Sequence, residues 1–256
     1  MLSVHNLVKE FDGLTAVSGL NFTVEPETIT GLIGPNGAGK TTTFNMITGH
    51  VKPSHGSIHF DGDDITDLRP HQAFHLGIVR TFQIPRPFSG MTVLENLTMV
   101  PGNQIGEKIW NNWLRRSTVE KEELRIQEKA NELLEFLNLS DLRNEFSGNL
   151  SGGQLKLLEL GRALMSDPKL ILLDEPGAGV NPTLLEEIIE RIRDIHGQGV
   201  TFLIIEHNME LVMRLCSSVL VMVEGGILMQ GSPEDIRSDP RLIDAFLGGG
   251  TLSSDN

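Results

Sequence analysis

The stretch from Gly34 to Thr41 constrains the fold of this chain most, because it fits the phosphate-binding pattern G-x-x-x-x-G-K-[ST] at every fixed position. An apolar, strand-like run at 29–33 precedes it, and 42–47 reads as the start of a helix. In this strand–loop–helix context, backbone N–H groups and the positive end of the helix dipole point at a bound anion. The sequence therefore predicts that the chain binds a nucleoside triphosphate.

The residue types of this loop suit both a phosphate and a metal ion. Lys40 adds a positive charge near the β- and γ-phosphates, and the Thr41 hydroxyl is a ligand for Mg²⁺. The alternative is a glycine-rich turn with a chance Lys-Thr pair, and the sequence context argues against it. We expect nucleotide contacts from Gly34, Asn36, Gly37, Ala38, Gly39, Lys40, Thr41 and Thr42.

The composition argues against several other classes of protein. Among the 256 residues, 21 are Lys or Arg and 34 are Asp or Glu, which gives a formal charge of −13. This acidic balance argues against sequence-independent binding to nucleic acid, whose affinity comes from basic side chains on phosphates. Cys216 is the only cysteine, so we expect neither a disulfide within the chain nor a cysteine metal site. It ends the apolar run 211–216, so we expect a small buried side chain. No apolar stretch approaches the length of about 18 residues that spans a bilayer, and the start lacks the layout of a signal peptide.

The pattern of apolar runs divides the chain into three zones. Residues 1–83 carry short apolar or alternating runs typical of strands, and residues 84–150 carry mostly helical spacing. From residue 151 onward, strands alternate with helices, which implies right-handed βαβ units and a largely parallel sheet. The expected strands are 2–8, 19–24, 29–33, 57–60, 78–82, 170–173 and 201–205, and the expected helices are 93–97, 119–137, 154–165 and 183–196.

These zones predict an α/β fold, with a phosphate-loop NTPase core that has a largely parallel sheet, antiparallel β elements and a helical subdomain. The boundaries predicted for this single domain, 1–250, are a core of 1–83 and 151–230, a helical subdomain of 84–150 and a C-terminal extension of 231–250. Residues 251–256 are predicted to be a flexible tail.

The run from Leu170 to Leu173 ends in two acidic residues, Asp174 and Glu175. Four apolar residues without alternation are typical of a strand buried on both faces of a parallel sheet. Residues at the carboxyl end of such a strand lie where ligands bind in open α/β sheets. We therefore expect Asp174 to hold Mg²⁺ and Glu175 to polarise an attacking water as a general base. The alternative is a solvated acidic turn.

The pentapeptide Leu-Ser-Gly-Gly-Gln at 150–154 predicts a second helix N-terminus that can bind an anion, with Ser151 as its N-cap. With this motif the sequence resembles the nucleotide-binding cassettes of ABC transporters, and the match extends from Phe11 to Phe246. The resemblance implies transport-coupled ATP hydrolysis by a head-to-tail pair of cassettes, with Lys40, Glu175 and His207 as catalytic residues. It implies that the γ-phosphate held by one cassette is contacted by Ser151, Gly153 and Gln154 of the facing cassette.

Further positions match the family one by one. Gln83 resembles the glutamine that touches Mg²⁺ and the water, and His207 is similar to the switch histidine that contacts the γ-phosphate. Phe11 occupies the place of an aromatic residue that stacks on adenine, and a core role is the alternative. Asn181 stands where the family pattern has an acidic residue, which changes the charge of that loop.

Four segments resemble the ATPases of branched-chain amino acid importers and their relatives for urea and short amides, namely 79–83, 91–97, 174–182 and 230–236. That group often has an aromatic residue in place of Gly152. The resemblance implies three kinds of partner, namely a second cassette, membrane-spanning permease subunits and, indirectly, an extracytoplasmic substrate-binding protein. It also implies a position at the cytoplasmic face of the membrane, with the permease docking on the insert after Gln83 through Arg86, Phe88 and Glu95.

Two other classes of function remain as alternatives. A soluble ABC ATPase that acts on nucleic acid or ribosomes usually carries two cassettes or a long coiled-coil insert, whereas this chain has one phosphate loop and an acidic balance. A phosphate-loop GTPase or kinase would have no use for the pentapeptide, and no Asn-Lys-x-Asp guanine motif is present. The sequence therefore favours the ATPase of an importer.

Overall fold

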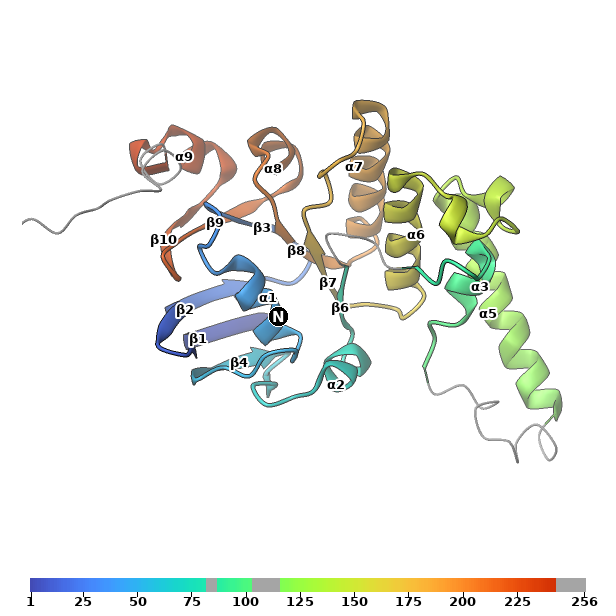
Figure 1. Cartoon of the computed structure of the whole chain (residues 1–256), viewed down its shortest axis with the longest axis horizontal. Coiled ribbons are helices and arrows are strands. Elements are labelled where there is room, and N and C mark those ends of the chain that lie inside the picture. Colours follow the sequence, from blue (N-terminus) through green and yellow to red (C-terminus); the bar gives the residue numbers. More distant parts are fainter. Residues whose placement is uncertain (82–86, 103–115, 243–256) are drawn as a thin grey trace, which may run out of the picture. The chain divides into compact units, whose positions relative to one another are not determined.

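The apolar run 29–33 forms β3 (Ile29–Ile33), which is buried along its whole length within a six-stranded sheet. The computed structural model describes residues 1–81, 87–102 and 116–242. In the sheet order β10-β9-β3-β8-β7-β6, all neighbours are parallel except β9 (Ser218–Val223) and β10 (Gly226–Gly231) (Figure 1). The remaining strands are β6 (Ile78–Arg80), β7 (Leu170–Asp174) and β8 (Thr201–Ile205).

The register of this sheet brings three strand ends to one edge. Leu32 of β3 pairs with Ile205 of β8, and Asp174 of β7 pairs with the same Ile205. Because these strands are parallel, the loops that follow them leave from the same side of the sheet. The phosphate loop, the acidic pair and the segment before His207 are therefore neighbours.

A second sheet is antiparallel and runs in the order β2-β1-β4-β5. Its strands are β1 (Leu2–Phe11), β2 (Leu14–Val24), β4 (His55–Phe60) and β5 (Asp63–Asp64). One apolar cluster joins both sheets to α1 (Lys40–Ile47), and its members include Leu7, Leu20, Leu32, Phe44, Ile58 and Leu203. This shared core fixes the helix that begins at Lys40.

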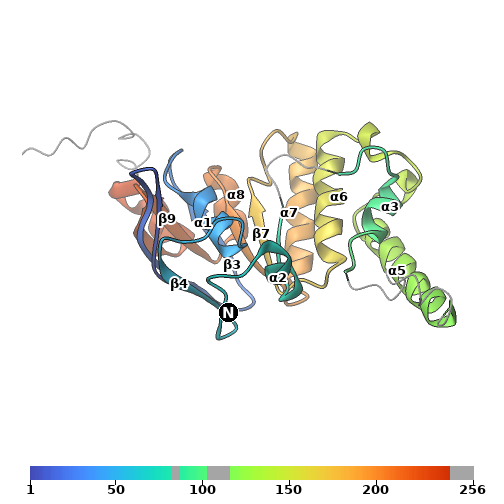
Figure 2. The same ribbon diagram turned by 60° about the horizontal axis from the view of Figure 1, so that its bottom comes forward.

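The chain forms two compact units, one made of 1–83, 169–178 and 192–256 and the other of 84–168 and 179–191. In the second unit, α3 (Val93–Thr98), α5 (Arg116–Phe136) and α6 (Gly152–Leu164) pack against one another (Figure 2). Gly161 lets α6 lie close to Leu137, the residue after α5, since a Cβ at Gly161 would lie 2.7 Å from Leu137 Cδ1. The short 3-10 helices η2 (Ser140–Leu142) and η3 (Ser147–Asn149) precede α6, and α7 (Pro182–His196) begins in this unit.

The predicted fold class is confirmed, and the predicted strands and helices exist: β3 and β8 have the predicted bounds, and the others have shifted ends. Within the described residues, the elements that were not predicted are β5, α2 (Pro70–His75), η2, η3, α8 (Met209–Leu215), β9, β10 and α9 (Pro233–Ser238). The strand expected at 78–82 ends at Arg80. Cys216 is buried, as expected. Across the parts of the chain that the structure describes, no helix is long and apolar enough to cross a membrane.

Candidate functional site

The phosphate loop follows β3 and is pressed against neighbouring backbone. A Cβ at Gly34 would lie 2.0 Å from the carbonyl oxygen of Met222, and one at Gly39 would lie 2.5 Å from that of Ala16. Gly39 also has a left-handed backbone, with φ of +99°, and it is the N-cap of α1. Because a side chain at either position would collide with backbone, two glycines of the pattern are required by packing within the chain.

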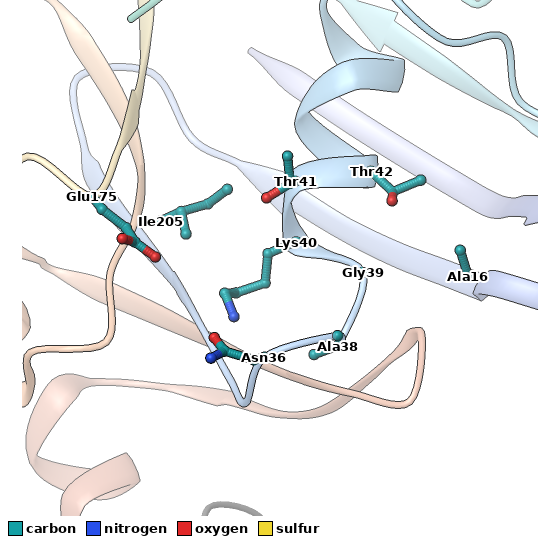
Figure 3. Close-up of a pocket in the computed structure, with 10 residues that line it drawn as sticks. Ala16, Asn36, Ala38, Gly39, Lys40, Thr41, Thr42, Glu175 and Ile205 are labelled. Atoms are coloured by element: carbon teal, nitrogen blue, oxygen red, sulfur yellow. The ribbon is translucent and has the colours of Figure 1, made fainter. Parts of the chain in front are cut away.

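This loop forms one wall of a pocket of about 190 Å³ (Figure 3). Glu175, from the end of β7, and Ile205, from the end of β8, also line it. The complete lining is Ala16, Asn36, Gly37, Ala38, Gly39, Lys40, Thr41, Thr42, Glu175 and Ile205. All of the predicted loop contacts except Gly34 therefore face one cavity, together with the predicted general base, while Ala16 and Ile205 were not predicted.

Lys40 is buried, and its side chain turns back along the loop (Figure 3). Its Nζ donates hydrogen bonds to the carbonyl oxygens of Gly34, at 2.7 Å, and Pro35, at 2.9 Å. Burial lowers the pKa of Lys40 below its ordinary value, and the charges of Glu175 and Asp174 oppose that shift. A phosphate in the pocket would favour the charged ammonium, so anion binding and the charge on Lys40 support each other.

Asp174 is the last residue of β7 and is 8% exposed. Its Oδ2 accepts a hydrogen bond from Arg80 Nη2 at 2.7 Å, and Arg80 Nη1 donates to Asn45 Oδ1 on α1. The Arg80 guanidinium also lies 5.6 Å from the centre of the Phe44 ring. The predicted metal ligand is thus held by a buried cation to which the sequence analysis gave no role. The only signal in the sequence was a basic residue at the end of an apolar strand.

The predicted magnesium ligands fit the chemistry of that ion. Thr41 and Asp174 offer a hydroxyl and a carboxylate, and Mg²⁺ prefers such oxygen ligands. Among the residues that the structure describes, no group of three or more His, Cys, Asp or Glu side chains could hold a metal ion. Water and phosphate oxygens would therefore supply most of the ligands, which is how Mg²⁺ is usually bound beside a nucleotide. Gln83, the third predicted ligand, lies outside the described residues.

Glu175 has a left-handed backbone, with φ of +50°. Its N–H donates to the carbonyl oxygen of Ile205 at 2.9 Å, and its own carbonyl accepts from Ala178 at 3.1 Å, which closes a tight turn. Its Oε1 lies 3.6 Å from Nδ1 of His207, whose side chain is 60% exposed. Non-glycine residues held in this backbone region cluster at functional sites. The structure therefore brings the predicted base and the predicted switch histidine side by side.

Phe11 ends β1 and is 43% exposed, so the alternative of a core residue is wrong. The Nζ of Lys9 lies 4.8 Å from the centre of its ring. Phe11 does not line the pocket described above. Stacking on adenine stays a prediction.

The pentapeptide at 150–154 begins α6 in the second unit. Ser151 is the N-cap, as predicted: its Oγ accepts from the Gln154 N–H, while Gln154 Oε1 accepts from the Ser151 N–H at 2.9 Å. A Cβ at Gly153 would lie 1.5 Å from Cδ2 of Leu184 on α7, so a side chain there would force the Leu184 side chain to move. A Cβ at Gly152, in contrast, would have none of the described residues' non-neighbouring atoms within 4 Å. Among the described residues, packing therefore disfavours a side chain at the second glycine of the pair and leaves open space at the first.

The Asn181 side chain has a structural role at the start of α7. Its Oδ1 accepts a hydrogen bond from the N–H of Leu184 at 3.0 Å. Asn and Asp cap helices about equally well. The departure from the acidic family pattern therefore removes a charge and keeps the cap.

Several known proteins are similar to this chain in sequence and in fold. The sequence pattern of the ABC transporter family matches residues 17–178. A probable branched-chain amino acid transport ATP-binding protein, LivG, of Archaeoglobus fulgidus is 46% identical over 97% of this chain and 95% of its own length. The high-affinity branched-chain amino acid transport ATP-binding protein LivG of Escherichia coli K12 is 38% identical over 97% and 98%. A solved ADP conformation of an ATP-binding cassette of an ABC transporter is 41% identical, with a TM-score of 0.83 over 97% of this chain and 98% of the other. The chain therefore belongs to the ABC transporter family.

Proposed function

We propose that this chain is the ATP-hydrolysing subunit of an importer of branched-chain amino acids. The observation that carries the ATPase assignment is the single pocket that holds the phosphate loop, Lys40 and Glu175. The substrate class rests on relatives described as branched-chain amino acid transport ATP-binding proteins, of which two are 46% and 42% identical. ATP hydrolysis is the activity general to the family.

In this proposal, Lys40 and the loop bind the phosphates of ATP, and Thr41 and Asp174 hold Mg²⁺ together with Gln83. Glu175 takes a proton from the attacking water, because its carboxylate lines the pocket. His207, 3.6 Å from that carboxylate, contacts the γ-phosphate, and Phe11 offers its exposed ring to adenine.

The proposed pairing of two cassettes is supported by the empty surroundings of Gly152. None of the described residues requires a glycine there, yet the position lies at the first turn of α6, where N–H groups attract an anion. In the proposed pair, Ser151, Gly153 and Gln154 approach the ATP of the facing cassette.

We assign docking of the membrane-spanning subunits to the helical unit, at the cytoplasmic face of the membrane. Phe88 is 48% exposed there. Glu95 has a second role, since its carboxylate accepts hydrogen bonds from the backbone N–H and hydroxyl of Thr92 and caps α3. A charge reversal at Glu95 would therefore also weaken the helix, and Glu95→Gln is the better test of docking. Arg86 lies outside the described residues.

The test is uptake by vesicles that contain the permease subunits copurified with this chain and an added substrate-binding protein. Leucine uptake should require ATP and stop in Lys40→Ala, while Lys52→Ala, with its exposed ammonium, should behave as wild type. ATP should bind to Lys40→Ala about 10- to 100-fold more weakly, because a hydrogen bond to a charged group contributes about 1.5–3 kcal/mol.

The alternatives give different results in the same vesicles. ATP-dependent uptake of urea or a short amide without leucine would identify the related importer class. ATP hydrolysis by a chain that copurifies with no permease would indicate a soluble ABC ATPase. Wild-type ATP affinity and turnover in Lys40→Ala would contradict the assignment of the site.

A further inference from the structure

Glu206 is a charged residue inside the protein, with only 1% of its surface exposed. It follows β8 directly and does not line the pocket. Its Oε1 accepts a hydrogen bond from the backbone N–H of Gly177 at 3.0 Å. Its Oε2 accepts two more, from the N–H of His207 at 3.0 Å and that of Asn208 at 3.1 Å. Burying a carboxylate costs free energy unless its oxygens are hydrogen-bonded, and these three bonds meet that need.

The three donors come from two different segments of the chain. Gly177 lies in the tight turn that carries Glu175, and this turn is closed by the bond from the Ala178 N–H to the Glu175 carbonyl. His207 and Asn208 lead into α8, and Asn208 Oδ1 caps that helix by accepting from the N–H groups of Glu210 and Leu211. One buried carboxylate thus ties the turn of the general base to the loop of the switch histidine.

We infer that Glu206 is a positioning residue for ATP hydrolysis, which holds the Glu175 turn and the His207 loop at their observed spacing. The inference rests on the proposed roles of Glu175 and His207. The turn needs such support, because Glu175 has a left-handed backbone that a non-glycine residue adopts only when its surroundings hold it there. Nothing in the sequence pattern indicated this role, since Glu206 reads as a polar residue after a strand.

A carboxylate suits this position because both of its oxygens accept hydrogen bonds. A glutamine of nearly the same size has one accepting oxygen, and its NH₂ group can only donate. In Glu206→Gln, that NH₂ group would face the N–H of either Gly177 or His207 and Asn208, so one of the two segments would lose its anchor. Glu206→Asp keeps two accepting oxygens on a side chain shorter by one methylene.

The experiment measures ATP hydrolysis in a single turnover, with the chain in excess over Mg-ATP and above its Kd for ATP, and, separately, the affinity for ATP. We expect Glu206→Gln to hydrolyse ATP about 10- to 100-fold more slowly, the loss typical of catalytic groups displaced by about 1 Å. ATP affinity should stay unchanged, because Glu206 does not line the pocket that holds the phosphate loop. Glu206→Asp should recover part of the rate. The matched control is Glu210→Gln, an exposed glutamate on α8, which should behave as wild type.

A double-mutant cycle with His207→Ala separates positioning from a general effect on folding. If Glu206 acts through the His207–Glu175 pair, Glu206→Gln should lower the residual rate of His207→Ala by a clearly smaller factor than it lowers the wild-type rate, because coupled residues are not additive. The inference would be overturned if the rate reductions of the two single variants multiplied in full in the double variant, or if Glu206→Gln hydrolysed ATP at the wild-type rate. If urea denaturation shows that Glu206→Gln does not fold, the same double-mutant cycle is measured with Glu206→Asp, and the same criterion applies to its rates. A wild-type chain that hydrolyses no ATP would instead contradict the proposed function.

Discussion

The ion pair between Arg80 and Asp174 makes a prediction at the residue scale. Both side chains are 8% exposed, whereas those of the surface pair Lys52 and Asp67 are 71% and 81% exposed. Arg80→Met keeps most of the length of the side chain and leaves the Asp174 carboxylate buried without this cation. Removing one partner of a buried pair typically costs about 3–5 kcal/mol. We therefore expect a loss of that size in the free energy of unfolding measured in urea.

Lys52→Met is the control, because exposed ion pairs contribute about 0–1 kcal/mol. Equal losses in the two variants would show that Arg80 is no more important than a surface cation. Sequence reasoning predicted the phosphate-loop residues that face the pocket, because the phosphate pattern is local, but it did not predict Ala16 and Ile205. It did not predict the partner of Arg80, because that contact depends on the pairing of β6 with β7, which are far apart in the chain.

At the scale of elements, Asn96 on α3 connects the segment around Phe88 to the segment around Ser147, which precedes α6. It is fully buried, and its Oδ1 accepts from the N–H of Phe88 at 2.9 Å. Its Nδ2 lies within hydrogen-bond distance of the Phe88, Met91 and Thr92 carbonyl oxygens and of Ser147 Oγ. Asn96→Ala would leave several buried polar groups without these bonds, at about 1–3 kcal/mol for each group left unsatisfied.

The expected result is faster amide hydrogen exchange at 88–92 and 145–150, together with unfolding at lower urea concentration. Asn131→Ala is the matched control, since Asn131 is exposed on α5 and the same substitution there should change stability by no more than about 0.5 kcal/mol. Unchanged exchange in both segments would contradict the connecting role of Asn96.

The elements that sequence reasoning found differ physically from those it missed. Three of the strands found, β3, β7 and β8, are apolar along nearly their whole length and are bounded by turn residues. Their burial can therefore be predicted from the sequence alone. The helices α2 and α8 have 6 and 7 residues, too few to establish a helical period. β9 is a short apolar run, which periodicity alone does not distinguish from a buried helix.

At the scale of the whole molecule, we predict that two copies associate when ATP is bound and not yet cleaved. Each subunit has a formal charge of −13, so two copies repel each other over long distances. The attraction must then come from the ATP, whose γ-phosphate is offered to the N-terminus of α6 in the facing copy. Glu175→Gln should keep the left-handed turn and the pocket, because glutamine is nearly isosteric, and should remove the general base.

Size-exclusion chromatography of Glu175→Gln with Mg-ATP should therefore show a species of twice the 28.2 kDa mass of the chain, which disappears with ADP. Glu175→Gln combined with Lys40→Ala is the control and should stay monomeric, because it lacks the cation beside the phosphates. Added salt should strengthen the dimer, since it screens the repulsion between the acidic subunits. A dimer that forms without nucleotide, or one that forms equally well in the double variant, would show that the contact does not depend on ATP. A monomer at saturating Mg-ATP would contradict pairing between identical copies.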